Sequence, residues 1–407
     1  MKILRIIARL NVGGPARHVV WLTRFLQDDE FQSELIAGTV PEGEEDMGYF
    51  AAEHEVTPIY IAELSRELSP KDLVSFWKIY RQIRRSEPDI IHTHTAKAGT
   101  VGRAAAFAYR WFTWRTLLAR PRAVKVVHTF HGHVFHSYYG KFKTRVFLLI
   151  ESVLAAIATD RIVVISPQQL GEISREFGIG RDDQFRVLPL GIDLAPFTKS
   201  GENRHYLRDE IGCSESDIVV CFTGRLTEIK DLPQLLRAAK LVRKLEPDLP
   251  VRFVIIGDGE LRTALEEMAS ELGLADDVHF FGHRADVASL VAGSDIIALT
   301  SRNEGTPLSL IEAMAAGVPF VSTAVGGVVD LAGEVLETDP QFRVCARGVL
   351  TEPGSPESMA RGLIYLAKNE KLRASLSESG CRFAAVEYSV ERLVSDMKGL
   401  YRELNRD

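Results

Sequence analysis

Cysteine is scarce in this chain, with four in 407 residues. The four stand far apart and form no Cys-x-x-Cys pair; they are Cys213, Cys221, Cys345 and Cys381. Zinc ribbons and disulfide-stabilised secreted domains depend on closely spaced cysteines, so neither class is expected. A reducing cytoplasm is the compartment that this pattern predicts.

Long hydrophobic runs are also missing. The longest candidate, residues 146–158, is interrupted by Glu151 and is shorter than the roughly 20 residues that a spanning helix needs. The opening segment MKILRIIARL is followed by two glycines where a secretory leader would have a small-residue cleavage site. We therefore expect neither a transmembrane helix nor a signal peptide.

Acidic residues are absent from residues 90–150, which contain ten Lys or Arg interspersed with Phe, Tyr and Trp. A basic and aromatic surface of this kind can lie on an anionic membrane leaflet or hold a lipid pyrophosphate. The candidate contacts are Lys97, Arg110, Arg115, Lys141 and Lys143. The alternative is a solvated face whose arginines pair with acids elsewhere. Nucleic acid is not expected, because no nucleic-acid motif accompanies the charge.

Short apolar, β-branched runs alternate with helical periodicity along the whole chain, which predicts parallel sheets wound with helices. The pattern restarts after a segment that contains glycine and two prolines. We therefore predict an α/β chain of two Rossmann-like, doubly wound domains. Their bounds are 1–190 and 200–380, with a linker at 191–199 and a C-terminal helical segment, 381–407, that packs back toward the first domain. Ligands of such folds bind outside the carboxyl ends of the strands, so two facing domains would form a deep cleft.

Glycines follow the first predicted strand, at positions 13 and 14. They either allow the backbone to approach a ligand or form a tight turn before a helix. The segment lacks the G-x-G-x-x-G fingerprint, and no acidic residue ends the second strand, so a nicotinamide dehydrogenase is disfavoured.

Histidines gather near the ends of the first-half strands, at positions 92, 94, 128, 131, 133 and 136. The region has no carboxylate and no H-E-x-x-H motif, so we do not expect a metal site. Hydrogen bonding to a sugar or phosphate fits better, and His131, which precedes a glycine, is the favoured residue.

Two cations, Arg225 and Lys230, follow the first strand of the second half in TGRLTEIKD. They could neutralise a diphosphate without a metal, or lie in a solvated turn. Further along, Thr306 as N-cap and Pro307 as first helical residue would begin a helix whose free N–H groups favour phosphate. Glu304 precedes this helix and Glu312 lies inside it.

The order of these segments resembles the retaining glycosyltransferases of the GT-B fold, in the large family 4 type group of sucrose-synthase-like, mannosyl- and N-acetylglucosaminyl-transferring enzymes. The resemblance covers essentially the whole chain. It rests on the glycine loop, His-Gly, Gly-Arg with a lysine five residues after the arginine, GDGE, EGTPLSLIEAMAAGVPFVST, VGG and GVLTEPGSPESMA.

The resemblance implies a role for each matching residue. Arg225 and Lys230 would hold the donor's diphosphate and Glu312 the ribose hydroxyls. Glu304 would approach the hydroxyls of the transferred sugar, and His131 would contact that sugar near its reacting carbon. The remaining donor contacts would be Gly14, Gly257, Gly305, Thr306 and Leu308. One departure from the family is Asp231, which stands where glycine usually follows the lysine.

The implied reaction moves a hexose or N-acetylhexosamine from a nucleotide-diphosphate sugar to a lipid-linked glycan or surface polysaccharide at the inner membrane face. UDP-sugar is the favoured donor and GDP-mannose the alternative. Retention by front-face displacement is part of the family picture. No metal or other cofactor is expected, because Arg, Lys and a helix N-terminus can stabilise the leaving diphosphate. The alternatives are a GT-B epimerase or phosphorylase and a noncatalytic carbohydrate-binding homologue.

Overall fold

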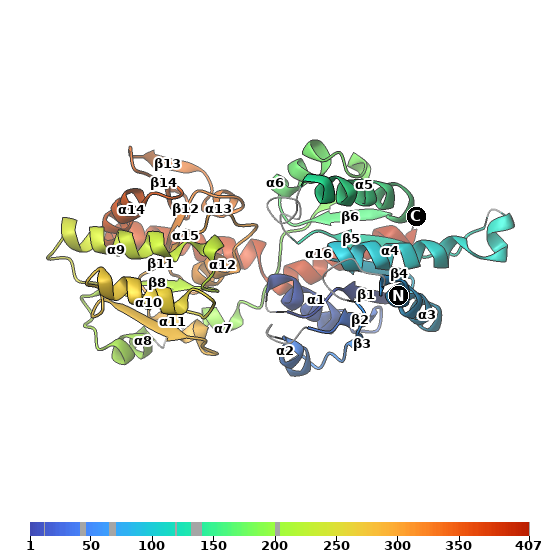
Figure 1. The fold of residues 1–407 in the computed structure, drawn as a ribbon, viewed down its shortest axis with the longest axis horizontal. Helices are drawn as coiled ribbons and strands as arrows, with labels where there is room; N and C mark the ends of the chain where they lie inside the picture. Colours follow the sequence, from blue (N-terminus) through green and yellow to red (C-terminus); the bar gives the residue numbers. More distant parts are fainter. Residues whose placement is uncertain are drawn as a thin grey trace. The chain divides into compact units, whose positions relative to one another are not determined.

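The computed structural model describes residues 1–11, 13–40, 46–64, 71–118, 120–131, 141–199 and 204–406, without the side chains of 115, 117, 141–143 and 204. The chain forms two compact units, visible as two sheet-and-helix bodies in Figure 1. Unit 1 contains Met1–Ile192 and Val390–Asp407, and unit 2 contains Asp193–Ser389. The sequence predicted that the second domain ends at residue 380, which lies inside α15 (Glu370–Glu387). The second unit instead ends at Ser389, after this helix.

Unit 1 is built on a parallel sheet of seven strands with the order β3-β2-β1-β4-β5-β6-β7. The strands are β1 (Lys2–Ile7), β2 (Gln32–Gly38), β3 (Ile59–Ile61), β4 (Ile90–His94), β5 (Lys125–Thr129), β6 (Arg161–Val164) and β7 (Phe185–Val187). Both faces of the sheet are buried, which explains the near-continuous apolar runs in the sequence.

Helices cover both faces of this sheet. They are α1 (Gly14–Phe25), α2 (Gly48–Glu53), α3 (Asp72–Ser86), α4 (Ala96–Trp111), α5 (Lys141–Ala158), α6 (Pro167–Leu170) and α16 (Val390–Arg406). Short helical turns are η1 (Trp114–Leu118), η2 (Gly171–Glu176) and η3 (Asp182–Gln184). Strand β1 shows how side chains divide between the faces: Leu4 joins the core beneath α3 and α4, whereas Ile3 joins the core beneath α1 and α16.

Unit 2 is built on a mixed sheet of eight strands, with the order β10-β9-β8-β11-β12-β15-β14-β13. The strands are β8 (Ile218–Thr223), β9 (Val251–Ile256), β10 (Val278–Gly282), β11 (Ile296–Leu299), β12 (Phe320–Thr323), β13 (Val335–Thr338), β14 (Phe342–Cys345) and β15 (Gly348–Thr351). Strands β13 and β14 run antiparallel to their neighbours. The sequence did not predict this edge, because no strand was assigned after residue 323.

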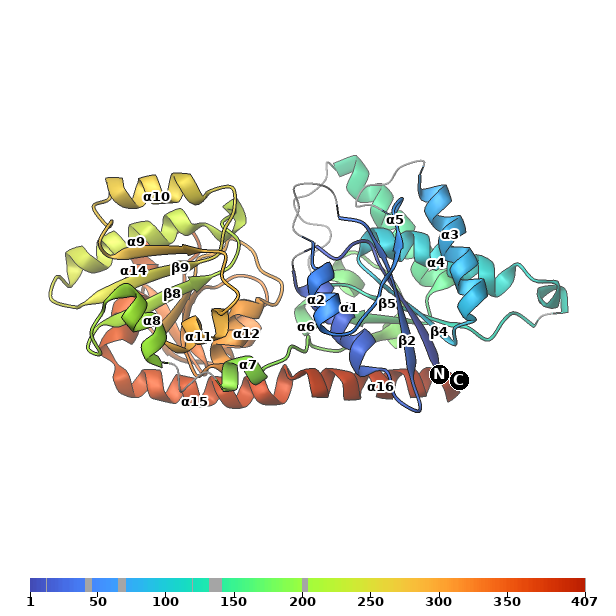
Figure 2. The same ribbon diagram turned by 90° about the horizontal axis from the view of Figure 1, so that it is seen from below.

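The helices of unit 2 form two groups, one on each side of β8 and β9 in Figure 2. Helices α9 (Leu232–Leu245), α10 (Arg262–Glu271) and α14 (Pro356–Lys368) pack together, and α12 (Leu308–Ala315) packs on α15. The remaining elements are α7 (Ala195–Thr198), α8 (Arg204–Ile211), η5 (Glu228–Lys230), α11 (Val287–Ala292) and α13 (Val328–Ala332). The two layers of helices around one sheet are the doubly wound arrangement that the sequence predicts.

A buried ion pair joins α8 to the residue that directly precedes β11 in unit 2. Arg208 donates to Asp295 at 2.5 Å, and both side chains are almost fully buried. The same carboxylate accepts a hydrogen bond at 2.8 Å from the backbone N–H of Val219 in β8. Asp295 therefore ties a helix and the central strand to one buried charge.

We expect Asp295→Ala to lower the free energy of unfolding by about 3–5 kcal/mol, because the variant leaves a buried guanidinium without its counter-charge. Urea denaturation followed by circular dichroism measures this loss. Glu378→Ala, which removes the exposed partner of Arg382 at 2.7 Å, serves as the control and should change the midpoint little. Equal, small effects of both variants would show that the buried pair is not a stabilising tie.

Candidate functional site

Each sheet has a point where the strand order reverses. In unit 2 the chain builds outward from β8 through β9 and β10, then returns to the other side of β8 with β11. In unit 1 the same reversal lies between β1 and β4. Loops leave the carboxyl ends of neighbouring strands in opposite directions at such a point, and ligands of α/β sheets bind there.

Two predicted site residues meet at the reversal in unit 2. Lys230 follows β8 and Glu304 follows β11, and Lys230 Nζ lies 2.5 Å from Glu304 Oε1. The Ser301 hydroxyl donates to the same oxygen at 2.5 Å. The lysine and glutamate side chains are 21% and 12% exposed, so the pair is sheltered and still reachable from solvent. Ser301 was not predicted from the sequence as a site residue. It lies just beyond the carboxyl end of β11, where polar residues often contact ligands.

Asp231, which stands where the family usually has glycine, adopts a backbone conformation that glycine readily takes. Its backbone is left-handed, with φ +45° and ψ +47°, a conformation that Asp tolerates better than most residues. Its carboxylate accepts a hydrogen bond at 3.0 Å from Nε of Arg302, which lies in the loop after β11. The departure from the family therefore adds a second ion pair between the loops that follow β8 and β11.

Two glycines around this site lie so close to a neighbouring segment of backbone that a Cβ atom would not fit there. A Cβ on Gly326, whose φ is +48°, would lie 1.9 Å from the carbonyl oxygen of Glu304. A Cβ on Gly257, whose φ is +134°, would lie 2.0 Å from the carbonyl oxygen of Gly224. These glycines let neighbouring loops pack directly on the backbone next to the predicted donor residues. The loop that carries Glu304 therefore packs closely on Gly326, and the loop that begins at Gly224 packs closely on Gly257.

The helix after Glu304 begins later than predicted. Helix α12 starts at Leu308, with Pro307 in an extended conformation at the N-cap, so Thr306 is not the cap. The extended ψ of Pro307 excludes this residue from the helix, and no side chain among the described residues caps the helix start. Glu312 then lies four residues beyond the first helical residue, roughly 6 Å along the axis, and is buried. The expectation of a helix N-terminus near Gly305, Thr306 and Leu308 is retained with a shifted start.

Arg225 lies immediately after Gly224 in the loop beyond β8, and its residue is exposed. No ion pair involves it within the described part of the chain. Gly257 follows β9, the neighbour of β8, so it belongs to the same edge. Arg225, Lys230, Gly257, Glu304 and the start of α12 are therefore together at one edge of the unit 2 sheet.

The histidines of unit 1 separate according to the strand pleat. His92 and His94 stack with ring centroids 4.2 Å apart, on the side that faces Tyr401 of α16. His128 instead contacts Thr93, at 2.8 Å between Nδ1 and Oγ1. His131, just beyond β5, lies 2.9 Å from His94 between Nε2 and Nδ1. His133 and His136 lie outside the described residues.

Burial lowers the pKa of His131 to about 3, and it also holds the pKa of His94 well below its usual value. Both imidazoles are therefore neutral at neutral pH, and each can donate or accept a hydrogen bond but carries no charge. This fits a hydrogen bond to a sugar hydroxyl better than charge neutralisation of a phosphate. Gly14, the other predicted residue of unit 1, is the first residue of α1, after the carboxyl end of β1.

Two of the basic residues proposed to meet an anionic surface are paired inside unit 1 instead. Lys97 is only 3% exposed and lies 2.7 Å from Asp72. Arg110 bonds Asp160 at 3.0 Å. A buried, paired cation cannot bind a membrane, so the expectation for Lys97 is wrong. Arg110 is partly exposed, and its pairing with Asp160 favours the alternative of internal pairing at that residue. The side chains of Arg115, Lys141 and Lys143 lie outside the described residues.

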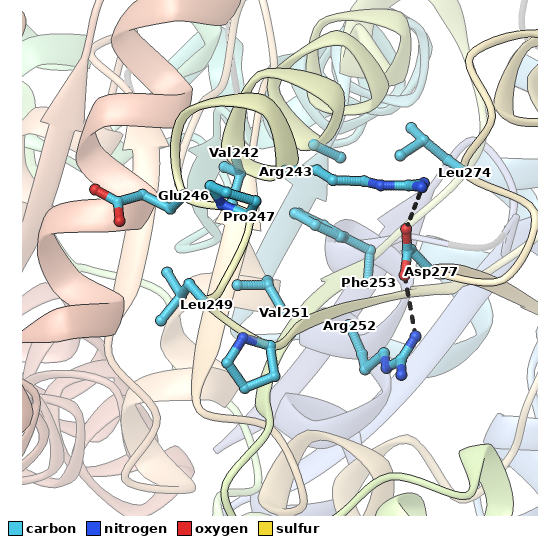
Figure 3. A pocket seen from close by; sticks show the side chains of 12 residues that line it. Val242, Arg243, Glu246, Pro247, Leu249, Val251, Arg252, Phe253, Leu274 and Asp277 are labelled. Atoms are coloured by element: carbon cyan, nitrogen blue, oxygen red, sulfur yellow. Dashed lines mark hydrogen bonds and ion pairs between the residues drawn. The ribbon is translucent and has the colours of Figure 1, made fainter.

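A pocket in unit 2 is lined by residues at the amino-terminal end of β9, among them Val251, Arg252 and Phe253 (Figure 3). Three of its four charged groups pair with one another, because Asp277 bonds Arg243 at 3.1 Å and Arg252 at 3.0 Å. Ligands of such sheets bind at the opposite, carboxyl edge. The pocket is therefore a structural groove, and the loop cluster beyond β8 and β11 remains the candidate site.

Comparison with known proteins agrees with this geometry. Residues 12–196 match the model of Glycosyltransferase Family 4, and residues 203–382 match that of Glycosyl transferases group 1. The chain is 28% identical over 355 residues to the Escherichia coli UDP-Gal:alpha-D-GlcNAc-diphosphoundecaprenol alpha-1,3-galactosyltransferase, covering 86% of this chain and 84% of that protein. It is 30% identical to the D-inositol 3-phosphate glycosyltransferase of Salinispora arenicola, covering 77% and 68% respectively.

Solved structures share the fold. The crystal structure of Anabaena HepE in complex with UDP superposes with a TM-score of 0.78 at 21% identity, covering 99% of this chain and all of that one. The sucrose-phosphate synthase of Thermosynechococcus elongatus gives a TM-score of 0.72 at 19% identity, covering 99% of each. The chain therefore belongs to the family 4 type glycosyltransferases of the GT-B fold, and it is a hexosyltransferase that uses a nucleotide-sugar donor.

Proposed function

We propose that this enzyme transfers a hexose or N-acetylhexosamine from a UDP-sugar to a lipid-linked glycan, with retention of the anomeric configuration. Unit 2 binds the donor and unit 1 the acceptor. The observation that carries the proposal is the edge beyond β8 and β11, where Arg225, Lys230 and the start of α12 come together. Two cations and free helix N–H groups suit the diphosphate of a donor.

The carboxylates of this edge suit the hydroxyls of the donor. Glu304 lies before α12 and Glu312 lies within it, on either side of the helix start. A carboxylate accepts hydrogen bonds from sugar and ribose hydroxyls, whereas a phosphate prefers the N–H groups between them. Glu304 would therefore contact the transferred sugar and Glu312 the ribose.

The charge that develops on the leaving diphosphate needs stabilisation in the transition state. Lys230 can bond Glu304 and a phosphate oxygen together, because an ammonium has three N–H donors. Preorganised cations act strongly in such a sheltered site, since they need little reorganisation during reaction. Neutral His131 would bond a hydroxyl of the transferred sugar, and the donor phosphate would help to deprotonate the acceptor on the same face. We expect no metal or other cofactor for this chemistry.

The acceptor assignment rests on two observations. The E. coli relative acts on a GlcNAc-diphosphoundecaprenol, by its name. In unit 1, the outward stripe of α5 is apolar: Val146, Leu149, Val153 and Ile157 are 40%, 66%, 46% and 50% exposed. Arg145 is exposed beside this stripe, and α3, which also packs on α4, exposes Leu73, Val74 and Trp77. An apolar face with basic neighbours fits the surface of an anionic membrane.

No helix in the described part of the chain is long and apolar enough to cross a bilayer. The proposed association is therefore peripheral, through side chains that enter the interface, and it would bring unit 1 to a lipid-linked acceptor at the inner face of the membrane. Basic residues next to the stripe would add attraction to anionic headgroups.

The proposal is tested by incubating the enzyme separately with UDP-hexoses, UDP-N-acetylhexosamines and GDP-mannose, each with a polyprenyl-diphosphate-linked GlcNAc acceptor. We expect release of UDP with one UDP-sugar, no turnover of GDP-mannose, and a product whose new linkage has the donor's α configuration by NMR. Inositol 3-phosphate is the comparison acceptor. A β-linked product would contradict retention, and turnover only with inositol 3-phosphate would contradict the lipid-linked acceptor.

Lys230→Met should lower kcat/KM by about 10²–10³, because it removes a cation that stabilises the leaving diphosphate. Lys368→Met is a matched control, since Lys368 also pairs with a glutamate, Glu246, at 2.5 Å but lies on α14. Steady-state kinetics on both variants, with thermal melting to check folding, give the comparison. Similar kcat/KM values for the two variants would remove Lys230 from the donor site.

The double variant Leu149→Glu/Val153→Glu should lose most of its binding to vesicles that contain phosphatidylglycerol, because it places two carboxylates on the apolar stripe of α5. Val386→Glu, at an exposed apolar residue of α15, is the control and should bind like the parent. Co-sedimentation measures the bound fraction. The membrane assignment fails if the parent stays in the supernatant or if the double variant binds equally well.

A further inference from the structure

Three histidines of unit 1 converge on one point, which we call the three-histidine cluster. His18 comes from α1, His94 ends β4, and His131 follows β5. One ring nitrogen from each lies within 4.8 Å of the other two. The ring centroids of His18 and His131 are 4.8 Å apart, and those of His94 and His131 are 5.2 Å apart. The strand reversal between β1 and β4 places the cluster at the carboxyl edge of the sheet.

Several nitrogens of this cluster have no hydrogen-bond partner among the described residues. His18 is only 2% exposed, and both of its ring nitrogens are buried without a hydrogen-bond partner. Nε2 of His94 and Nδ1 of His131 are also unpartnered. Buried polar atoms are nearly always satisfied in proteins, so such a concentration requires an explanation. A ligand that accepts lone pairs from imidazoles provides one.

The chemistry of the donors narrows the ligand. Metals bind the neutral form of imidazole, and burial holds the pKa of His18 and His94 well below the usual value. Ligands that are all nitrogen suit zinc and its neighbours in the transition series and do not suit Mg²⁺ or Ca²⁺, which prefer oxygen. Three histidines with an open fourth position are a known arrangement for Zn²⁺. Two nitrogens on one zinc lie about 3.3 Å apart for bonds of 2.0–2.1 Å, so small side-chain rotations would close the cluster on an ion.

Neighbouring charges argue against a permanently bound ion. The guanidinium groups of Arg5 and Arg392 act on His18 electrostatically, and Arg5 also acts on His94. Positive charge close to the cluster weakens the binding of any cation. Among the described residues, the cluster includes no carboxylate that would compensate. These features fit a site that a metal ion occupies reversibly.

We propose that the three-histidine cluster is a reversible, inhibitory binding site for a divalent transition metal ion such as Zn²⁺. Binding does not depend on the proposed function, whereas inhibition rests on the role proposed there for His131. An ion held by His131 withdraws that imidazole from the donor sugar. The site is therefore regulatory and supplies no chemistry to the transfer.

The test uses the full chain after treatment with a chelator, with Zn²⁺ followed by calorimetry and Co²⁺ by its visible d–d absorption. We expect one ion per chain and the intense spectrum of a low-coordinate Co²⁺ site. His18→Phe keeps the ring volume and loses both unpartnered nitrogens, so it should fold. It should bind Zn²⁺ at least about tenfold more weakly, because the loss of a direct ligand should cost no less affinity than the loss of a residue that only supports a ligand. His279→Phe, which removes a partly buried histidine of β10 with an unpartnered Nε2, is the matched control.

Activity gives a second, separate readout. Zn²⁺ should inhibit transfer by the parent and by His279→Phe at the same concentration, and EDTA should restore it. His18→Phe should keep the basal rate and require at least about tenfold more Zn²⁺. An unchanged Co²⁺ spectrum in His18→Phe would overturn the site. If no donor is turned over, calorimetry and the Co²⁺ spectrum still decide the site, so its failure is distinguishable from failure of the proposed function.

Discussion

The contact between Lys230 and Glu304 determines how the rest of the donor edge is arranged. The two residues come from loops that only the parallel order of β8 and β11 makes neighbours. Around this pair, the Thr300 hydroxyl donates to the carbonyl oxygen of Lys230 at 2.9 Å, and Arg302 bonds Asp231 at 3.0 Å. Each contact joins the same two loops, so a shift of one loop would break several bonds together. Lys230, the cation proposed to contact the diphosphate, is therefore held in place by the fold itself, which is what electrostatic stabilisation requires.

The elements of the fold were predictable because each carries a strong local pattern. Apolar runs marked β1, β8 and β9, and amphipathic periodicity marked the last three helices within a few residues. Strands β3, β13, β14 and β15 escaped prediction. Strand β13, for example, is exposed along its length and has no buried face to impose an alternating pattern. Order along the chain indicated Lys230 and Glu304 as site residues. Ser301 and Arg302 were missed, because only the meeting of two distant loops gives them a partner.

Charge was harder to interpret than hydrophobicity, because a window of sequence counts only one side of each ion pair. The stretch without acids looks like a basic surface, yet Arg103 pairs with Glu151 at 2.5 Å, Lys97 with Asp72 and Arg110 with Asp160. All three acids lie outside the window; Glu151 and Asp160 follow its end by one and ten residues. Among the described side chains, the window also leaves apolar groups at the surface, on the outward stripe of α5 and at Trp114 and Leu118 of η1. The membrane association is therefore a proposal that rests on hydrophobic exposure, and the buried Lys97 does not support it.

The histidines show how the pleat of a strand separates residues that look equivalent in sequence. His92, His94 and His128 all lie in or at the ends of neighbouring strands, but register pairs Thr93 with His128 and His94 with Thr129. His128 therefore shares a face with Thr93, while His94 faces the opposite side together with His92. Only His94 can then meet His131 beyond β5 and His18 on α1. The absence of a carboxylate in this part of the sequence argued against a metal, and that argument applies to ions that prefer oxygen ligands. It does not exclude an ion that needs only imidazole, because three neutral rings on three separate elements already supply that ligand set.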